Sequence, residues 1–326
     1  MGAVLVTGAS GFIGRHIVLA LQARGEQVVA SGRDPQALAR LPGGIAVRPV
    51  DLCRDDLDAL LRGCEAVIHP AARSTPWGPA AAFERDNVLA TQRLLDAARR
   101  AQIRRFVHFS SPSIYFRYAD QHAVTEDFAP PARWITDYAR TKWESEVRVR
   151  QAAAEGLPCV VLRPRAVFGE GDRAIFPRLL AVARRGWFPL VHGGRAIIDT
   201  THIDNVVDAA LACLSPAVPG DGRAYNLSNG EPIAVAALLR QVFEACDLRV
   251  RMVPVPRTLA VGLAGVGEAI ARRRRDCPEP RLTRYSVGVI GWSQTLDIGR
   301  ARQELGYTPR VSIAEGLARF ARSVRA

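Results

Sequence analysis

The sequence predicts an α/β protein in which a doubly wound parallel sheet carries a smaller, mostly helical lobe. Over the first two-thirds of the 326 residues, short apolar runs alternate with helical patterns. Strands that are apolar throughout and separated by helices are typical of a parallel sheet covered on both faces. In the last third, helical patterns dominate. We therefore expect residues 1–167 to form the main unit, with residues 195–227 returning to it, and residues 168–194 and 228–326 to form the lobe.

The strands expected in the main sheet are rich in Val, Ile, Leu and Ala, and helical segments separate them. Their expected ranges are residues 3–6, 27–30, 45–50, 66–69, 105–109 and 159–162. The first helix carries Ile13, Ile17 and Leu21 on one face and ends at Gly25. Longer helices are expected over residues 83–101 and 138–149.

The lobe is expected to contain helices over residues 233–246, 258–272 and 312–321 and short strands near 249–253 and 294–296. The segment 258–270 has one apolar side, and arginines follow it at 272–275. We interpret it as a lobe helix packed on the core, with a solvated basic end that suits the helix dipole. The alternative is weak peripheral contact with an anionic membrane. The chain has no run of about 18 uncharged apolar residues that would predict a transmembrane helix.

Composition and charge exclude several classes of protein. Hydrophobic residues make up 48% of the chain and charged residues 23%, as in ordinary globular proteins. The net charge is +12, but the arginines are spread over many helices and no binding motif is present, so no nucleic-acid partner is expected. The six cysteines are scattered without CxxC or zinc spacing. This spacing predicts no metal site. Because no segment has the pattern of a signal peptide, we expect a cytoplasmic protein.

A glycine-rich segment joins the first strand to the first helix. Its residues are Thr7, Gly8, Ala9, Ser10, Gly11, Phe12, Ile13 and Gly14. Glycines here permit a tight turn, bring the backbone close to a pyrophosphate, and let the helix pack closely on the strand. The helix N-terminus offers free N–H groups and the positive end of the helix dipole. This strand–turn–helix context predicts dinucleotide binding.

The end of the second strand bears on the choice of cofactor. Sites for NAD usually place a carboxylate there to hold the ribose 2′-hydroxyl, but this chain has Gly32 followed by Arg33. An arginine suits a 2′-phosphate, so NADP(H) is expected, with NAD(H) as the alternative. Asp34 precedes a proline and fits a helix N-cap instead of the missing acid. Asp51 and Leu52, after the third strand, either meet the adenine or cap the next helix.

Lys142 is the only lysine of the chain. All the other residues among the 44 lysines and arginines are arginine. Tyr138 lies four residues earlier, so the two side chains share a helix face. A nearby ammonium lowers the pKa of a phenol, which lets the tyrosine exchange a proton with a carbinol or carbonyl oxygen near neutral pH. A hydroxyl at the end of the preceding strand would hold the reacting oxygen, and Ser110, Ser111 and Ser113 are the candidates.

Together these motifs resemble the extended short-chain dehydrogenase/reductase family, also called the NAD-dependent epimerase/dehydratase family, over essentially the whole chain. The family's TGxxGxxG motif matches Gly8, Gly11 and Gly14, and its YxxxK motif matches Tyr138 and Lys142. The resemblance implies a Rossmann sheet, an oxidoreductase activity and a homodimer formed through two long helices.

The resemblance also implies further site residues. Aligned back from Ile114 and Tyr115, the catalytic hydroxyl falls on Ser111, with Ser110 as the register alternative. The further cofactor contacts are Ala71, Ala72, Asn87, Ser110, Arg163, Pro164 and Ala166. Segments 110–115 and 163–172 look closest to the 3β-hydroxysteroid dehydrogenase and 3-oxoalkanoate reductase branch of the family.

These residues predict reversible hydride transfer between NADP(H) and a secondary alcohol or ketone. Tyr138 would move the proton, Ser111 would position the oxygen, and Lys142 would hold the nicotinamide ribose. The candidate substrate contacts are Trp134, Phe168, Phe176, Arg195 and Trp292. Their aromatic character favours an apolar small molecule, steroid-like or 3-oxoacyl-like.

Two alternative functions use the same motifs. A nucleotide-sugar epimerase or dehydratase would keep NAD(P) tightly bound, and Arg165 and Arg195 could meet the substrate diphosphate. A non-catalytic NADPH-binding protein is the second alternative, although it would be expected to have a broken catalytic triad.

Overall fold

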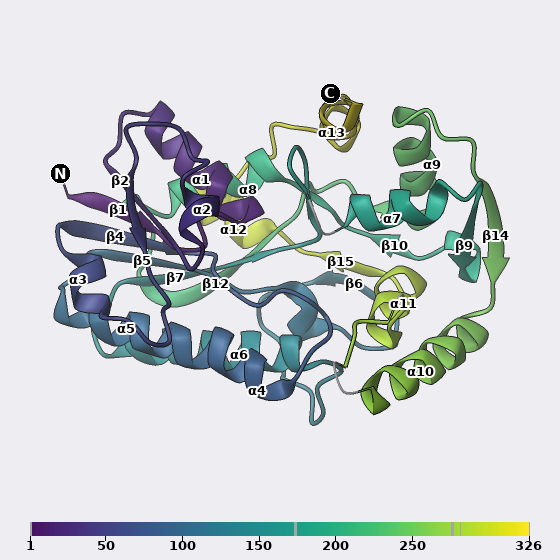
Figure 1. The fold of residues 1–326 in the computed structure, drawn as a ribbon, viewed down its shortest axis with the longest axis horizontal. Helices are drawn as coiled ribbons and strands as arrows, with labels where there is room; N and C mark the ends of the chain where they lie inside the picture. Colours follow the sequence, from purple (N-terminus) through teal and green to yellow (C-terminus); the bar gives the residue numbers. More distant parts are fainter. Residues whose placement is uncertain (1, 173–174, 275–276, 281, 326) are drawn as a thin grey trace.

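Seven parallel strands form the main sheet of the structure, a computed structural model that describes residues 2–172, 175–274, 277–280 and 282–325 (Figure 1). The strand order is β12-β7-β5-β4-β1-β2-β3. The bounds are β1 (Ala3–Val6), β2 (Val28–Gly32), β3 (Ala46–Pro49), β4 (Cys64–His69), β5 (Arg105–Phe109), β7 (Cys159–Pro164) and β12 (Asp221–Leu227). The order reverses beside β1, so the carboxyl ends of β1 and β4 flank a crevice at the switch point. This confirms the predicted doubly wound sheet.

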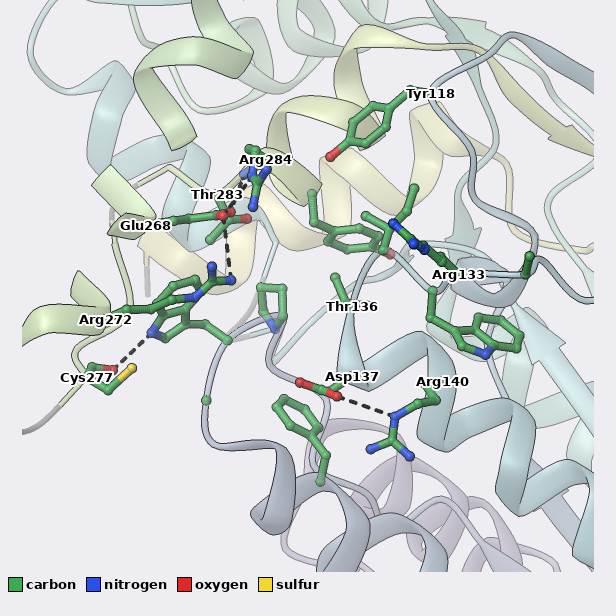
Figure 2. Close-up of a pocket in the computed structure, with 18 residues that line it drawn as sticks. Tyr118, Arg133, Thr136, Asp137, Arg140, Glu268, Arg272, Cys277, Thr283 and Arg284 are labelled. Carbon is green, nitrogen blue, oxygen red and sulfur yellow. Dashed lines mark hydrogen bonds and ion pairs between the residues drawn. The ribbon is translucent and has the colours of Figure 1, made fainter. Parts of the chain in front are cut away.

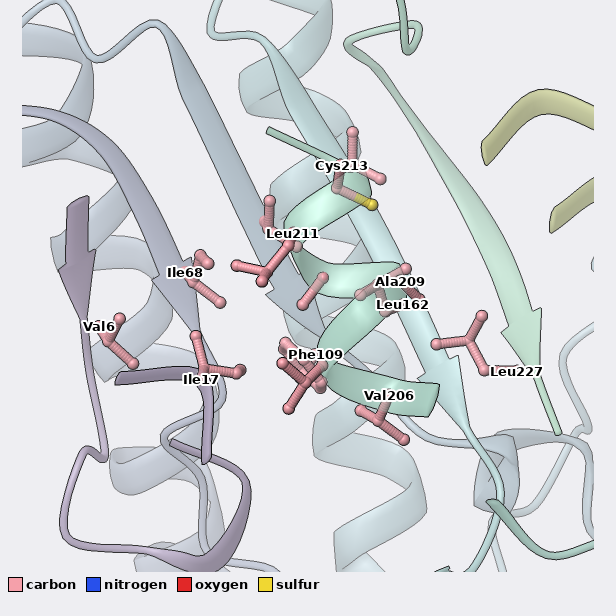
Figure 3. Packing of buried hydrophobic residues seen from close by; sticks show 14 of the residues in the cluster. Val6, Ile17, Ile68, Phe109, Leu162, Val206, Ala209, Leu211, Cys213 and Leu227 are labelled. Atoms are coloured by element: carbon pink, nitrogen blue, oxygen red, sulfur yellow. The ribbon is translucent and has the colours of Figure 1, made fainter. Parts of the chain in front are cut away.

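Helices cover both faces of this sheet. On one face lie α1 (Phe12–Ala23) and α8 (Ile203–Ala212), and on the other lie α3 (Leu57–Leu61), α5 (Ala90–Arg100) and α6 (Asp137–Ala154). Figure 3 shows Val6 and Ile68 of the sheet packed with Ile17 of α1 and Leu211 of α8. The neighbouring Leu5 belongs to the core on the opposite face. Because both faces of each strand are buried, the strands need the nearly continuous apolar runs from which they were predicted.

The smaller lobe is built on a four-stranded sheet of order β13-β10-β15-β6 and a parallel pair, β14 and β9. The strand bounds are β6 (Gln121–Val124), β9 (Trp187–Val191), β10 (Ile197–Ile198), β13 (Ile233–Ala234), β14 (Arg251–Val255) and β15 (Gln294–Leu296). The lobe helices are α7 (Phe176–Ala183), α9 (Val235–Ala245), α10 (Arg257–Arg273), α11 (Arg284–Gly291) and α13 (Ile313–Arg325). Phe176, Leu239, Phe243 and Phe320 form part of its core.

Some segments take a different place from the one expected. Within residues 195–227, β12 and α8 do join the main unit, but β10 pairs in the smaller sheet. Conversely, β6 comes from the first 167 residues and also lies in the smaller sheet. Such short strands carry too few residues for a periodic pattern, so their sheet is decided only by tertiary pairing.

The predicted helix over residues 83–101 is three consecutive helical segments. These are α4 (Ala80–Phe83), the π-helical η1 (Glu84–Leu89) and α5 (Ala90–Arg100).

The interpretation of 258–270 as a helix whose apolar side packs on the core is wrong in one respect. Small residues of α10 face the core, and its larger apolar side chains are exposed. Arg275, the last of the four expected basic residues, lies outside the described residues.

A buried ion pair ties α6 to the main sheet. Arg163 of β7 is completely buried and binds both carboxylate oxygens of Glu146 on α6, with Nε at 3.1 Å from Oε2. The same guanidinium donates to the hydroxyl of Tyr115 and to the carbonyl of Glu126. Arg163 of the sheet therefore binds three other segments of the chain, those that contain Tyr115, Glu126 and Glu146.

Replacing one partner of this pair should destabilise the protein strongly. A Glu146→Gln variant leaves the buried Arg163 guanidinium without its counter-charge, which costs about 3 kcal/mol of unfolding free energy or more. Urea unfolding followed by circular dichroism measures this loss. Glu155→Gln is the matched control, because Glu155 pairs with Arg99 at the surface and should lose less than about 1 kcal/mol. Equal losses in the two variants would contradict the role given to the buried pair.

Candidate active site

The glycine-rich segment between β1 and α1 brings three pieces of backbone into close contact. Gly8 has a φ of +59°, and a Cβ added to it would lie 3.0 Å from the Cα of Ala71. A Cβ on Gly14 would lie 2.3 Å from the Gly8 carbonyl oxygen. No side chain caps the first turn of α1 among the described residues. The turn therefore leaves backbone N–H groups free at a helix N-terminus, where an anion is favoured.

A cavity of about 620 Å³ lies over this turn at the carboxyl ends of the strands. We call it the glycine-loop cavity. It is lined by Thr7, Gly8, Ser10, Gly11, Phe12, Ile13, Gly14, Arg33, Asp51, Leu52, Ala71, Ala72, Ser110, Ser111, Tyr138, Lys142, Pro164 and Ala166 among others. The structure thus brings together in one cavity most of the residues expected to bind the cofactor.

The groups in this cavity fit a dinucleotide. The hydroxyls of Ser31 and Ser110 are buried and have no hydrogen-bond partner within the described part of the chain, and both residues line the cavity. Buried hydroxyls are normally paired, so a ligand that supplies their partners suits the site. The bare helix N-terminus and the close backbone at Gly8 suit a pyrophosphate.

Two expected cofactor contacts do not line this cavity. Asn87 is buried, and its amide bonds the backbone of Arg73 and the hydroxyl of Thr141. It therefore supports the loop after β4 instead of facing the cavity. Arg163 turns beneath the sheet to Glu146, because a buried guanidinium needs a counter-charge.

The acidic residues near the end of β2 are placed as follows. Asp34 accepts hydrogen bonds from the next two available backbone N–H groups, at 2.9 and 3.1 Å, and is the N-cap of α2 (Pro35–Leu38) as predicted. Asp51 accepts from the Cys53 N–H at 2.9 Å and also lines the cavity. It does not cap the next helix, since Asp56 is the N-cap of α3.

Three polar side chains meet at one edge of the glycine-loop cavity. Ser111 is the N-cap of a short 3₁₀ helix, η2 (Pro112–Tyr115), and Tyr138 and Lys142 lie one turn apart on α6. The Lys142 ammonium donates to the Phe109 carbonyl at 2.6 Å. All three side chains line the glycine-loop cavity.

The expected lowering of the Tyr138 pKa is not found. Burial raises the pKa of Tyr138 to about 12, and the Ser111 hydroxyl opposes this rise. Burial lowers the pKa of Lys142 to about 8, against the opposing charge of Glu146. The Lys142 ammonium donates its hydrogen bond to the Phe109 carbonyl and not to the Tyr138 phenol. The four-residue spacing on the helix was therefore not enough to predict the contact.

A second cavity, of about 660 Å³, adjoins the segment that precedes Tyr138 (Figure 2). We call it the aromatic cavity. Its aromatic lining residues are Trp77, Phe83, Tyr118, Trp134 and Tyr285. Its charged lining residues are Arg133, Asp137, Arg140, Glu268, Arg272 and Arg284. Arg284 binds Glu268 at 2.9 Å, and Arg140 binds Asp137 and two further carboxylates.

Of the five expected substrate contacts, only Trp134 lines this cavity. Phe168 and Phe176 pack on each other in the core of the lobe, with ring centroids 5.2 Å apart. Arg195 is exposed and lines neither cavity. Trp292 lies behind the lining residue Tyr118, 5.1 Å away between ring centroids. The sequence could not distinguish aromatic rings of the core from those of the cavity. Both kinds of ring are apolar, and both lie far along the chain from the catalytic motifs.

A sequence model of one family matches residues 4–228, which include the whole glycine-loop cavity. The chain belongs to the NAD dependent epimerase/dehydratase family. As a member of this family it is an NAD(P)-dependent oxidoreductase.

Relatives in the family match nearly the full chain. The uncharacterized protein YbjS of Escherichia coli is 34% identical over 99% of this chain and 97% of its own. A 2-alkyl-3-oxoalkanoate reductase of Stenotrophomonas maltophilia is 34% identical over 97% of this chain and 98% of its own. A 3-beta-hydroxysteroid dehydrogenase of Mycolicibacterium neoaurum is 27% identical over 98% and 90%. The resemblance to this branch of the family is thereby confirmed.

Among solved structures, MoeE5 in complex with UDP-glucuronic acid and NAD has a TM-score of 0.78 and 30% sequence identity, and the match covers 99% of each chain. This likeness confirms the fold class expected from the sequence. It also shows that a family member of this shape binds NAD together with a nucleotide sugar.

Sequence reasoning missed several residues of the site. Tyr285 lines the aromatic cavity, and ionisation of its phenol would raise the pKa of Tyr138, although the two are far apart in the chain. Arg73 lines the glycine-loop cavity directly after the expected Ala71 and Ala72. The position of Arg73 in the chain could have indicated it, whereas nothing local distinguishes Tyr285.

The lowered pKa of Lys142 predicts a dependence of stability on pH. The folded protein loses this proton near pH 8, whereas an unfolded lysine loses it near 10.5. Between these values the unfolded chain binds more protons, so stability increases with pH. Relative to a Lys142→Met variant, the cofactor-free wild type should therefore gain unfolding free energy across this interval. Urea unfolding of both proteins measures it, and a difference that is constant with pH would contradict the burial of a charged Lys142.

Proposed function

We propose that the chain is a ketoreductase that uses NADPH to reduce a ketone of a largely apolar substrate. The single observation that carries the proposal is the convergence of Ser111, Tyr138 and Lys142 on the glycine-loop cavity. Relatives named as an oxoalkanoate reductase and a hydroxysteroid dehydrogenase support hydride transfer at a carbonyl or carbinol carbon.

The lining of the aromatic cavity supports an apolar substrate. Its five aromatic side chains offer a large apolar surface. Arg140 and Arg284, which could otherwise hold a diphosphate, are already paired with carboxylates.

Proton transfer in this reaction falls to Tyr138. Bound NADPH supplies a hydride to the carbonyl carbon. Tyr138 transfers its hydroxyl proton to the carbonyl oxygen as that oxygen gains negative charge, and Ser111 donates a hydrogen bond to the same oxygen. The pKa of about 12 keeps the proton on Tyr138 before the reaction. Lys142 would hold the nicotinamide ribose with the N–H donors that its bond to the Phe109 carbonyl leaves over.

Removing the proton donor should abolish most of the activity without loss of the cofactor. For Tyr138→Phe we expect kcat for reduction of a model ketone to fall roughly a hundred- to ten-thousandfold. The dissociation constant for NADPH should change little, because the variant lacks only the hydroxyl. Steady-state kinetics and fluorescence titration of NADPH measure the two quantities. A variant that keeps near-wild-type kcat would sink the assigned role of Tyr138.

The charges around the adenosine end support NADPH over NADH. Arg33, Arg73 and Asp86 line the glycine-loop cavity. The Asp86 carboxylate lies 3.7 Å from Arg33, 3.0 Å from Arg73 and 2.8 Å from Arg85. Although burial opposes it, hydrogen bonds from Arg85 and Arg73 lower the pKa of Asp86. Arg33 is the most exposed of the three arginines around Asp86, which supports a contact between Arg33 and a 2′-phosphate.

Reversing the charge of Arg33 tests this preference. In Arg33→Glu we expect NADPH affinity to fall roughly tenfold to a hundredfold, while NADH affinity changes little. Arg104→Glu is the control, because Arg104 is also highly exposed but lies at the other end of the sheet. Titration of each protein with both cofactors measures the ratio. If wild type binds NADH as tightly as NADPH, the preference is wrong.

One observation favours a second function, a nucleotide-sugar epimerase or dehydratase. MoeE5, at 30% identity over nearly all of both chains, binds UDP-glucuronic acid and NAD. Such an enzyme returns its hydride and keeps its cofactor. Purified protein that releases a stoichiometric amount of NAD on denaturation would support this function over net ketone reduction.

Two exposed side chains support a homodimer. Leu89 of η1 and Val147 of α6 are large apolar residues at the surface of the helical layer. Burying them against a second copy through these helices would remove apolar surface from water. Light scattering of wild type and a Val147→Glu variant tests this arrangement.

A further inference from the structure

Helix α10 (Arg257–Arg273) exposes a continuous row of large apolar side chains. Leu259, Leu263, Val266 and Ile270 are 53%, 60%, 61% and 54% exposed. We call these four residues the apolar stripe. Their spacing of four, three and four residues places them on one face of the helix. Scattered exposed apolar residues are ordinary, but an uninterrupted row along one helix marks a surface that another phase or molecule covers.

The inner face of α10 accounts for the stripe. The helix packs on the lobe through Ala260, Ala264 and Ala271, whose small side chains bury little apolar surface. The only charged residue between positions 258 and 271 is Glu268, which is buried and bound to Arg284 at 2.9 Å. The outward face of α10 is therefore uncharged over this length. Its larger side chains are more exposed than its smaller ones, the reverse of a core-packing helix.

The carboxyl end of the helix is strongly basic. Arg272, Arg273 and Arg274 are exposed, and neither Arg273 nor Arg274 forms an ion pair with a described residue. On the strands before α10, exposed Trp187 of β9 lies opposite exposed Arg251 of β14. Figure 1 shows these strands and α10 at the same end of the molecule.

We propose that α10 lies in the interface of an anionic lipid bilayer, with the apolar stripe among the acyl chains and Arg273 and Arg274 among the lipid headgroups. An apolar helix face with an adjoining basic cluster has the charge and hydrophobicity that such a surface binds. A tryptophan beside an arginine suits the same boundary. None of the described helices is long and apolar enough to cross a membrane, so contact is limited to the surface.

A membrane-bound α10 bears on how substrate reaches the site, a consequence that rests on the proposed function. The opposite side of this helix forms part of the aromatic cavity through Glu268 and Arg272, and the Arg272 guanidinium lies 5.2 Å above the Trp77 ring. Helix α10 would therefore separate the bilayer from the cavity by a single layer. An apolar ketone dissolved in the membrane could reach the site without crossing water.

Vesicle flotation tests the proposal directly. Full-length protein is mixed with vesicles of equal parts phosphatidylglycerol and phosphatidylcholine, or of phosphatidylcholine alone, and centrifuged through a density gradient. Wild type should float with the anionic vesicles, much less with the neutral ones, and less at high salt. A Leu263→Gln/Val266→Gln variant, and separately an Arg273→Ala/Arg274→Ala variant, should each lose on the order of tenfold in affinity. The matched control, Val47→Gln/Val324→Gln, replaces two exposed apolar residues elsewhere and should float like wild type.

Two further measurements separate the outcomes. Circular dichroism and the reduction of a water-soluble ketone should be unchanged in the Leu263/Val266 variant, since its side chains lie outside both cavities. A wild type that stays at the bottom of the gradient with anionic vesicles overturns the proposal. So does a stripe variant that floats like wild type, or one whose only change is a smaller oligomer by light scattering, which would make the stripe a subunit interface. If the wild-type protein does not reduce the ketone, this result counts against the proposed function and leaves the membrane result unaffected.

Discussion

The buried ion pair between Arg163 and Glu146 is the constraint on which the geometry of the site depends. Glu146 lies one turn after Lys142 on α6, and Arg163 directly precedes Pro164, the last residue of β7. Arg163 also holds Tyr115, the last residue of the 3₁₀ helix that Ser111 begins. One guanidinium of β7 therefore connects both segments that carry the residues proposed to transfer the proton. A loss of this pair would shift the segments relative to one another, and proton transfer is sensitive to displacements of about an ångström.

The electrostatics of the site depend on a ligand that completes it. Burial raises the pKa of Tyr138, so its hydroxyl keeps its proton. Burial also lowers the pKa of Lys142, so its ammonium loses a proton more easily. Unpaired hydroxyls at Ser31 and Ser110 line the same cavity. A polar cavity of this kind is costly when empty and favourable when filled, because buried polar groups need partners. The residues of the glycine-loop cavity therefore fit a dinucleotide, whose charges would change the pKa values of Tyr138 and Lys142.

The lobe serves two opposing demands through α10. Its inner face packs on the lobe core through alanines, and Glu268 and Arg272 of the same helix line the aromatic cavity. The apolar stripe lies on the outer face, and membrane binding would remove it from water.

Much of the main unit could be predicted from the sequence because its signals are local. The continuous apolar strands, the glycine turn at Gly8 to Gly14 and the spacing of Tyr138 and Lys142 each depend on neighbouring residues and on the period of one element. The sequence by itself thus determined the parallel sheet, the glycine turn and the shared helix face of Tyr138 and Lys142, whereas the choice of Ser111 over Ser110 rested on the family resemblance. Only the tertiary structure decided that Arg163 and Asn87 support the site from behind, that Phe168 and Phe176 lie in the core, and that Tyr285 faces the cavity. The orientation of a side chain toward core, cavity or solvent depends on packing between segments distant in the chain, and no local pattern encodes that packing.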